Sequence, residues 1–294
     1  MEKRIITRRD FLRAAAGATM AVAWRPGFLK EAWGEEKTRV ILIRHRDVLD
    51  QDGKIQPEIL KKMVDEAVAA LLSEKDPLPA WRKLFQPSDV VGIKSNSWRD
   101  MPTPKELEAV LKGRLIDVAI PEKDIAIADR GVGTNPAFLT ATALLNVRPA
   151  RTHHWAGMGS CIKNYIQFVS RPSDYHPDAC ADLAQIWSLP AVKGKTRLNI
   201  LCVLMPQFYG RGTHLDQRYL WPYKGLLLGI DPVAVDAVGA HLLKTKRVAF
   251  FGEDKELDVL PTHIEVADKK YHLGESDLSH IQVMKLGWTE DILI

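Results

Sequence analysis

The sequence predicts an α/β fold, built as a mostly parallel sheet with helices on both faces. Short runs of Val, Ile, Leu and Ala alternate along the chain with longer segments in which apolar residues recur every three to four positions. This alternation is typical of βαβ units with right-handed crossovers, which place parallel strands side by side. A long irregular central segment at residues 146–193 and a C-terminal hairpin complete the prediction.

Three strand–helix pairs are expected in the first half of the domain. Residues 39–44 (RVILIR) form a continuous apolar run, which indicates a strand, and Pro57 opens a helical apolar pattern over residues 58–72. The other elements expected in this half are strands at 89–93 and 124–129 and helices at 103–118 and 136–145.

Residues 146–193 differ from the rest, because they are rich in His, Gly, Pro, Ser and Asp and contain only short helical pieces, such as residues 182–189. An irregular segment of this length usually forms functional loops, so we expect it to fold over the site as a lid. The elements expected after it are strands at 197–205 and 225–230, a helix at 231–243 and a hairpin at 262–283.

Residues 1–23 resemble a twin-arginine export signal. Arg8 and Arg9 precede a small-residue apolar run, residues 14–23, that ends in Ala-Val-Ala. The run is too short to span a bilayer as a stable helix, and its small-residue end is typical of a cleavage site. The twin-arginine export machinery reads this address and carries folded cargo, often with a cofactor already inserted. An amphipathic N-terminal helix that stays attached is the alternative.

We therefore expect cleavage after Ala23, a linker at residues 24–37 and a single α/β domain at residues 38–294 in a periplasmic or extracytoplasmic protein. The signal carries five basic and two acidic residues, so it accounts for about three of the chain's four net positive charges. The nearly neutral remainder lacks the basic excess that nucleic-acid binding needs. No later apolar run approaches the roughly 20 residues of a membrane span, so no transmembrane anchor is expected after cleavage.

The chain has three cysteines, Cys161, Cys180 and Cys202, and no Cys-x-x-Cys pair. Three thiols cannot supply four thiolate ligands, so a thiolate-ligated iron–sulfur cluster is not expected within this chain. Cys202 lies in an apolar run and is expected to be a buried strand residue. A disulfide between Cys161 and Cys180 and a pair of free thiols both remain open.

Three sequence blocks carry a family resemblance: residues 89–96 (DVVGIKSN), residues 161–165 (CIKNY) and residues 229–238 (GIDPVAVDAV). In this order they resemble the domain of unknown function 362 family. The resemblance implies an α/β fold and leaves the reaction open. Some members of that family also carry ferredoxin-type cysteine clusters, which this sequence lacks.

Polar residues follow two of the expected strands, where ligands collect in open parallel sheets. Lys94 offers a charge to an anionic group, Asn96 offers a donor and an acceptor, and Asp129 begins a Gly-rich turn after the next strand. The turn lacks the Gly-Lys-Ser/Thr of a P-loop. The structural alternative is that Lys94 lies along the strand end while Asn96 caps a turn.

The central segment contributes further candidates. Lys163 could bind a carboxylate or phosphate, or act as a base if burial lowered its pKa, and Asn164 lies beside it. His154 and His176 are candidate ligands of a divalent transition metal, as is His214, which forms a His-x-Asp pair with Asp216. A solvated turn is the alternative for the adjacent His153 and His154, because neighbouring side chains on an extended segment point apart.

Two aspartates belong to the last block of the resemblance. Asp231 precedes Pro232 and is explained as a helix N-cap, whereas Asp236 lies in a nearly all-apolar helix. A carboxylate buried there needs a partner, so we expect Asp236 to meet a basic side chain or a metal and to serve as the counter-ion between Lys94 and Lys163.

These residues are expected to converge in one site of an enzyme that acts on a small anionic metabolite. The expected catalytic residues are Lys94, Lys163 and Asp236, the ligand-binding residues Asn96, Asp129, Asn164 and Asp231, and the metal ligands His154, His176 and His214. The alternative is a non-catalytic ligand- or metal-binding accessory of a periplasmic complex.

Overall fold

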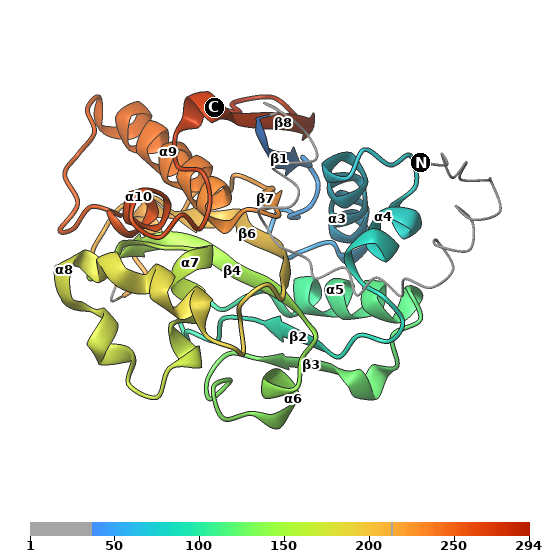
Figure 1. Cartoon of the computed structure of the whole chain (residues 1–294). Coiled ribbons are helices and arrows are strands. Elements are labelled where there is room, and N and C mark those ends of the chain that lie inside the picture. The colour runs from blue at the N-terminus through green and yellow to red at the C-terminus, as the bar shows by residue number, and fades with distance from the viewer. Residues whose placement is uncertain (1–36, 213) are drawn as a thin grey trace, which may run out of the picture.

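An eight-stranded sheet runs through residues 37–212 and 214–294, the part of the chain that the computed structural model describes (Figure 1). The expected signal and most of the linker lie outside these residues. Seven strands follow the order β3-β2-β4-β6-β7-β1-β8, and β5 pairs with β4. The strands are β1 (Thr38–Arg44), β2 (Val91–Lys94), β3 (Ile125–Ala128), β4 (Ala143–His153), β5 (Gly157–Gly159), β6 (Thr196–Gln207), β7 (Gly225–Gly229) and β8 (Ile281–Gly287).

The sheet is mixed and mostly parallel, which confirms the predicted fold class. The parallel pairs are β2–β3, β2–β4, β4–β6 and β1–β8, whereas β1–β7, β6–β7 and β4–β5 are antiparallel. The carboxyl ends of β2, β3, β4 and β6 therefore lie along one edge of the sheet.

Helices cover both faces of the sheet, as Figure 1 shows. On one face, α3 (Pro57–Leu71), α4 (Pro77–Leu84) and α5 (Lys105–Asp117) enclose a core with Ile41 and Ile43 of β1. On the other face, α6 (Pro136–Leu139), α7 (Cys161–Asn164), α9 (Pro232–Phe251) and α10 (His263–Lys269) contribute to a second core, which includes Val40 and Leu42 of β1. Successive strand residues point to opposite faces, so each inner strand is buried on both sides.

The predicted helix over residues 136–145 is wrong in its second half. Helix α6 ends at Leu139, and residues 143–153 form β4, the long strand between β2 and β6. Its sequence, ALLNVRPARTH, contains Asn, Arg and Pro among the apolar residues. This composition is unusual for a buried strand, so the strand was not predicted. Pro149 is accommodated where the register between β4 and β6 shifts.

The central segment is therefore less irregular than expected. Residues 146–159 contain most of β4 and all of β5. From Cys161 onward the chain does consist of short helical pieces, which are α7, η2 (Tyr165–Phe168), η3 (Pro172–Tyr175), α8 (Pro177–Cys180) and η4 (Ala181–Ser188).

The predicted C-terminal hairpin is not formed. The turn-like residues 267–270 instead end α10, and β8 pairs in parallel with β1 at the edge of the sheet. A parallel partner more than 200 positions earlier in the chain leaves no local signal in the sequence. No described helix has the length and apolar character needed to cross a membrane.

Candidate functional site

Polar and charged side chains gather at the carboxyl ends of β2, β3 and β4, on the face that α7 and α9 cover. Lys94 ends β2, Asp129 follows β3, and Arg148 lies on β4 two residues beyond the partner of Lys94 in the register. This is the edge of a parallel sheet at which ligands usually bind.

The ammonium group of Lys94 is fully buried and makes three hydrogen bonds. Its Nζ donates to Asp129 Oδ1 at 2.6 Å, to the Ser95 carbonyl at 2.6 Å and to Asn164 Oδ1 at 3.3 Å. Burial lowers the pKa of Lys94 to about 8, although the charge of Asp129 opposes this shift. The expected meeting of Lys94 and Asn164 is thus confirmed, and the counter-ion of Lys94 is Asp129.

Three buried asparagine side chains continue this network across the sheet. Asn164 Nδ2 donates to Asn146 Oδ1 at 2.8 Å, and Asn146 Nδ2 donates to Asn199 Oδ1 at 2.9 Å. Asn199 in turn donates to the carbonyl of Ile230, directly before α9. Because each amide is satisfied, the chain fixes the position of Asn164 beside Lys94.

Asp236 is fully buried on α9, as predicted, but its partners are not those expected. Its two carboxylate oxygens accept from the backbone N–H groups of Cys161 at 2.7 Å and Ile162 at 2.8 Å. The predicted role of Asp236 as the counter-ion of Lys94 and Lys163 is therefore wrong. The physical reason is that the first turn of α7 offers free N–H donors, which satisfy a carboxylate as well as a cation does. Burial raises the pKa of Asp236 to about 6.

Two buried arginines of β4 belong to this site and were not predicted. Arg148 is 4% exposed and donates from Nη1 to the Ser160 carbonyl, while Arg151 donates to the carbonyls of Thr152 and Gly212. The Nε atoms of both arginines are buried without a hydrogen-bond partner. Burial lowers the pKa of both guanidinium groups, that of Arg151 to about 9.

Lys163 is the fourth buried cation. Its Nζ lies 3.5 Å from Cys180 Sγ, and no carboxylate among residues 37–212 and 214–294 lies within ion-pair distance of it. Burial lowers the pKa of Lys163 to about 8; the Cys180 thiol opposes this shift, and the charge of Arg148 adds to it.

The histidines of the central segment form a stack of rings. His153 and His154 stack with their centroids 4.9 Å apart, and the ring of Trp155 lies 4.3 Å from His154 and 4.0 Å from His176. The expectation that the two adjacent rings point apart is wrong, because β4 ends at His153 and the chain turns there. Burial lowers the pKa of all three imidazoles, and neighbouring positive charges add to the effect.

The three candidate metal ligands are not brought together by a contact. His154 and His176 each contact Trp155, whereas His214 is exposed in the loop after β6. Within the described parts of the chain, no three His, Cys, Asp or Glu side chains are arranged to hold a metal ion.

Two of the candidate ligand-binding residues have local roles. Asn96 Oδ1 accepts from the Trp98 N–H in a turn, at 3.4 Å. Asp231 caps α9 by accepting from the N–H groups of Val233 and Ala234, and its other oxygen accepts from Glu275 N at 2.8 Å. Burial raises the pKa of Asp231 to about 6.

All three cysteines are buried free thiols, so Cys161 and Cys180 do not form a disulfide. Burial raises the pKa of each thiol, and that of Cys202, on β6, rises to about 12.

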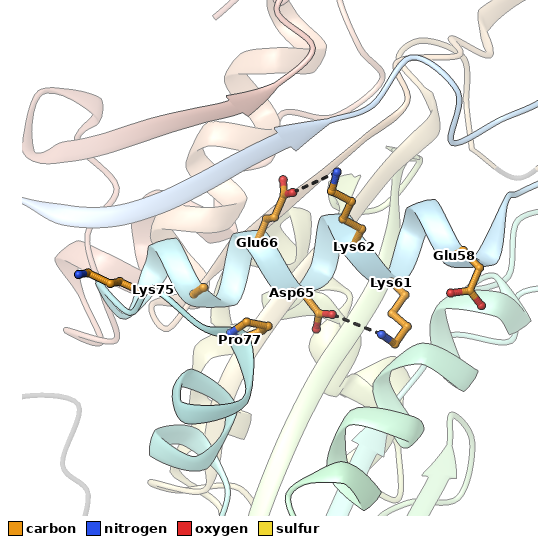
Figure 2. A pocket seen from close by; sticks show the side chains of 8 residues that line it. Glu58, Lys61, Lys62, Asp65, Glu66, Lys75 and Pro77 are labelled. Carbon is orange, nitrogen blue, oxygen red and sulfur yellow. Dashed lines mark ion pairs between the residues drawn. The ribbon is translucent and has the colours of Figure 1, made fainter.

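A surface cavity lies away from this cluster, along α3 on the opposite face of the sheet (Figure 2). Its charged side chains form i,i+4 ion pairs, Lys61 with Asp65 and Lys62 with Glu66, each at 3.7 Å. The Lys62–Glu66 pair is exposed and contributes little free energy, whereas Asp65 is buried and also pairs with Arg114. These pairs leave no excess charge for a ligand.

Residues 97–241 match the model of the family described as Domain of unknown function (DUF362). Neither a curated protein nor a solved structure matches the chain. The matched residues include Asp129, Arg148, Lys163, Asn164 and Asp236, and Lys94 lies just before them. The chain is thus similar to this family over residues 97–241, which include β3, β4, β6 and β7 of the sheet.

Proposed function

We propose that the buried cluster binds a small anionic metabolite, and that the chain is an enzyme in which Lys163 transfers a proton to or from that metabolite. The observation that carries the proposal is an excess of buried cations. Within the part of the chain that the structure describes, the cluster holds two carboxylates, Asp129 and Asp236, and four buried cations, which are Lys94, Arg148, Arg151 and Lys163.

Buried charges without partners are costly, because desolvation takes several kcal/mol from each ion. The unpartnered Nε atoms of Arg148 and Arg151 add two buried donors that an anion would satisfy. An anionic ligand supplies both the missing charge and the missing acceptors.

Lys163 is the best candidate for proton transfer. Its pKa of about 8 lies close to neutral pH, where a general base or acid is most effective, and its amine makes no ion pair among the described residues. In this account Lys94, held by Asp129, supplies charge, and Asp236 positions α7, which carries both Lys163 and Asn164.

Binding is tested by thermal unfolding of the domain with small phosphates, sulfates and carboxylates. The proposal predicts that at least one class raises the melting temperature of the wild type and not of Arg148→Met. Lys244→Met, which removes an exposed cation of α9, serves as the matched control and should respond like the wild type. A wild type that responds to none of these anions contradicts the proposal.

Turnover is tested by incubating the protein with a small-metabolite extract and following anionic species by mass spectrometry. The wild type should consume one of them, whereas Lys163→Met should not consume it even at a concentration of the metabolite that saturates the variant. Binding without consumption by either protein would favour the second candidate function.

That second candidate is a non-catalytic accessory that holds a ligand or a metal for a partner. One observation favours it: Nδ1 of His154 is buried and has no hydrogen-bond partner, which leaves a free imidazole nitrogen. Elemental analysis of the folded protein tests whether the accessory holds a metal. Stoichiometric metal in the wild type that is lost in His154→Ala would support a metal-binding accessory, and a wild type without metal would rule it out.

We also propose that the protein is exported by the twin-arginine machinery and works outside the cytoplasm. The support is the sequence of residues 1–23, with Arg8 and Arg9 ahead of the apolar run. Export in the folded state would suit a domain whose site depends on strands far apart in the chain.

A further inference from the structure

The buried positive charges are concentrated in a small volume. Arg148 and Arg151 both pack against Gly159 of β5, where an added Cβ would lie 2.8 Å from Arg148 Nη2 and 3.3 Å from Arg151 Cγ. Any larger residue at this position would displace one of the arginines. Gly159 thus lies against the guanidinium group of Arg148 and the aliphatic stem of Arg151.

The charges in this volume do not balance. Asp129 neutralises Lys94 at 2.6 Å, and the carboxylate of Asp236 offsets one further positive charge, since Arg148 lies within its electrostatic range. Arg151 and Lys163 then remain without a carboxylate. Asp100, which lies near Arg151, is already paired with Arg99 at 3.1 Å. The site therefore carries about two uncompensated positive charges.

The hydrogen-bond donors that remain without a partner favour a ligand with one compact anionic group over a ligand with two separated charges. The unpartnered Nε atoms belong to two arginines that pack on the same glycine, and Lys163 lies within electrostatic range of both arginines. Guanidinium groups donate in a fixed fork that matches the oxygens of phosphate, and ammonium groups add point charges to it. A dicarboxylate would place its two charges several ångströms apart, away from this focus.

Trp98 limits where such a group can bind. Its ring lies against the guanidinium of Arg151, with the carbon Cζ 3.8 Å from the ring centroid. One face of this guanidinium is therefore covered, its Nη1 is used by the carbonyls of Thr152 and Gly212, and its buried Nε is left without a partner.

Building on the proposed anion site, we propose that it recognises a dianionic tetrahedral oxyanion, the phosphate group of a small phosphorylated metabolite. Arg148, Arg151 and Lys163 bind this group, and Arg151 and Lys163 select for its second negative charge. Lys94 stays paired with Asp129 and contributes to the positive potential.

The test compares anions of like shape and different charge by isothermal titration calorimetry at constant ionic strength. Sulfate should bind about tenfold or more tightly than methanesulfonate, which has one negative charge fewer. Arg151→Met and, as a second variant, Lys163→Met should reduce this preference several-fold while both proteins retain their circular dichroism spectra. The control Lys244→Met should keep it.

Two further probes identify the source of the group. If glycerol phosphate binds more tightly than inorganic phosphate, the natural ligand is a phosphate monoester. If the two affinities are equal, the site recognises the dianion alone, and inorganic phosphate is its ligand. Equal binding of sulfate and methanesulfonate, or tighter binding of succinate than of sulfate, would overturn the inference and leave the anion site intact. If no anion binds, the proposed function fails as well.

Discussion

The ammonium nitrogen of Lys94 and the side-chain oxygen of Asn164 lie 3.3 Å apart, although 70 positions separate the two residues in the chain. The contact links the end of β2 to α7, which follows β4 and β5 in the chain. Asp236 holds α7 from the other side through two backbone N–H groups. The site thus depends on a strand end, a four-residue helix and a long helix that meet only in the folded domain.

The Lys94–Asp129 pair should show strong coupling in a double-mutant cycle. Lys94→Met or Asp129→Asn alone leaves a buried charge without its partner and should lower the free energy of unfolding by about 3 kcal/mol. The double variant should be less destabilised than the sum of the two, as measured by urea unfolding. Additive effects would show that the two side chains are not paired in solution.

Asp236→Ala should destabilise the domain strongly, because it leaves two buried N–H groups of α7 unsatisfied. The expected loss is about 2 to 5 kcal/mol in urea unfolding. Asp258→Asn, which removes an exposed carboxylate paired with Arg211, should cost less than about 1 kcal/mol and serves as the control. A loss for Asp236→Ala no larger than that of the control would contradict the assigned role.

Affinity for sulfate should fall as the pH rises through about 8. Lys94 and Lys163 both have a pKa of about 8, so they are charged below this pH and lose their attraction for an anion above it. Sulfate keeps its charge over the range, and calorimetry from pH 6.5 to about 8.5, below the pKa of about 9 of Arg151, would follow the change. Lys163→Met should flatten the profile. An affinity that stays constant across this range would show that neither lysine contributes.

Replacement of Arg8 and Arg9 by lysine should trap the precursor in the cytoplasm, since the export machinery reads the paired arginines. The wild type should be exported and shortened, with its new N-terminus at Trp24. Cell fractionation and N-terminal sequencing give the readout. Normal export of the double variant would refute the twin-arginine assignment.

The sequence predicted the part of the site that depends on short apolar strands and on the three blocks of family resemblance. Lys94, Asp129 and Asn164 could be placed together because parallel strands align their carboxyl ends, whatever their separation in the chain. The burial of Asp236 also followed from its apolar neighbours. The partners of Asp236 could not be predicted, because they are backbone N–H groups, which every residue except proline has and which no sequence pattern marks.

Arg148 and Arg151 could not be found in the same way. Their strand, β4, contains Asn146, two arginines and Pro149, so its composition resembles a loop although it lies in the middle of the sheet. The signal that could have revealed it is the apolar start ALLNV directly after a short helix. Similarly, β8 finds its partner β1 at the opposite end of the chain, which local patterns do not report.

The most direct test of the shared anion site is a crystal structure of the protein soaked with tungstate, a tetrahedral dianion located by its anomalous scattering. The account predicts one strong peak within hydrogen-bond distance of Arg148, Arg151 and Lys163, and its loss in Arg148→Met. A peak at another place, or guanidinium and ammonium groups that point away from one another with no anion between them, would contradict the account.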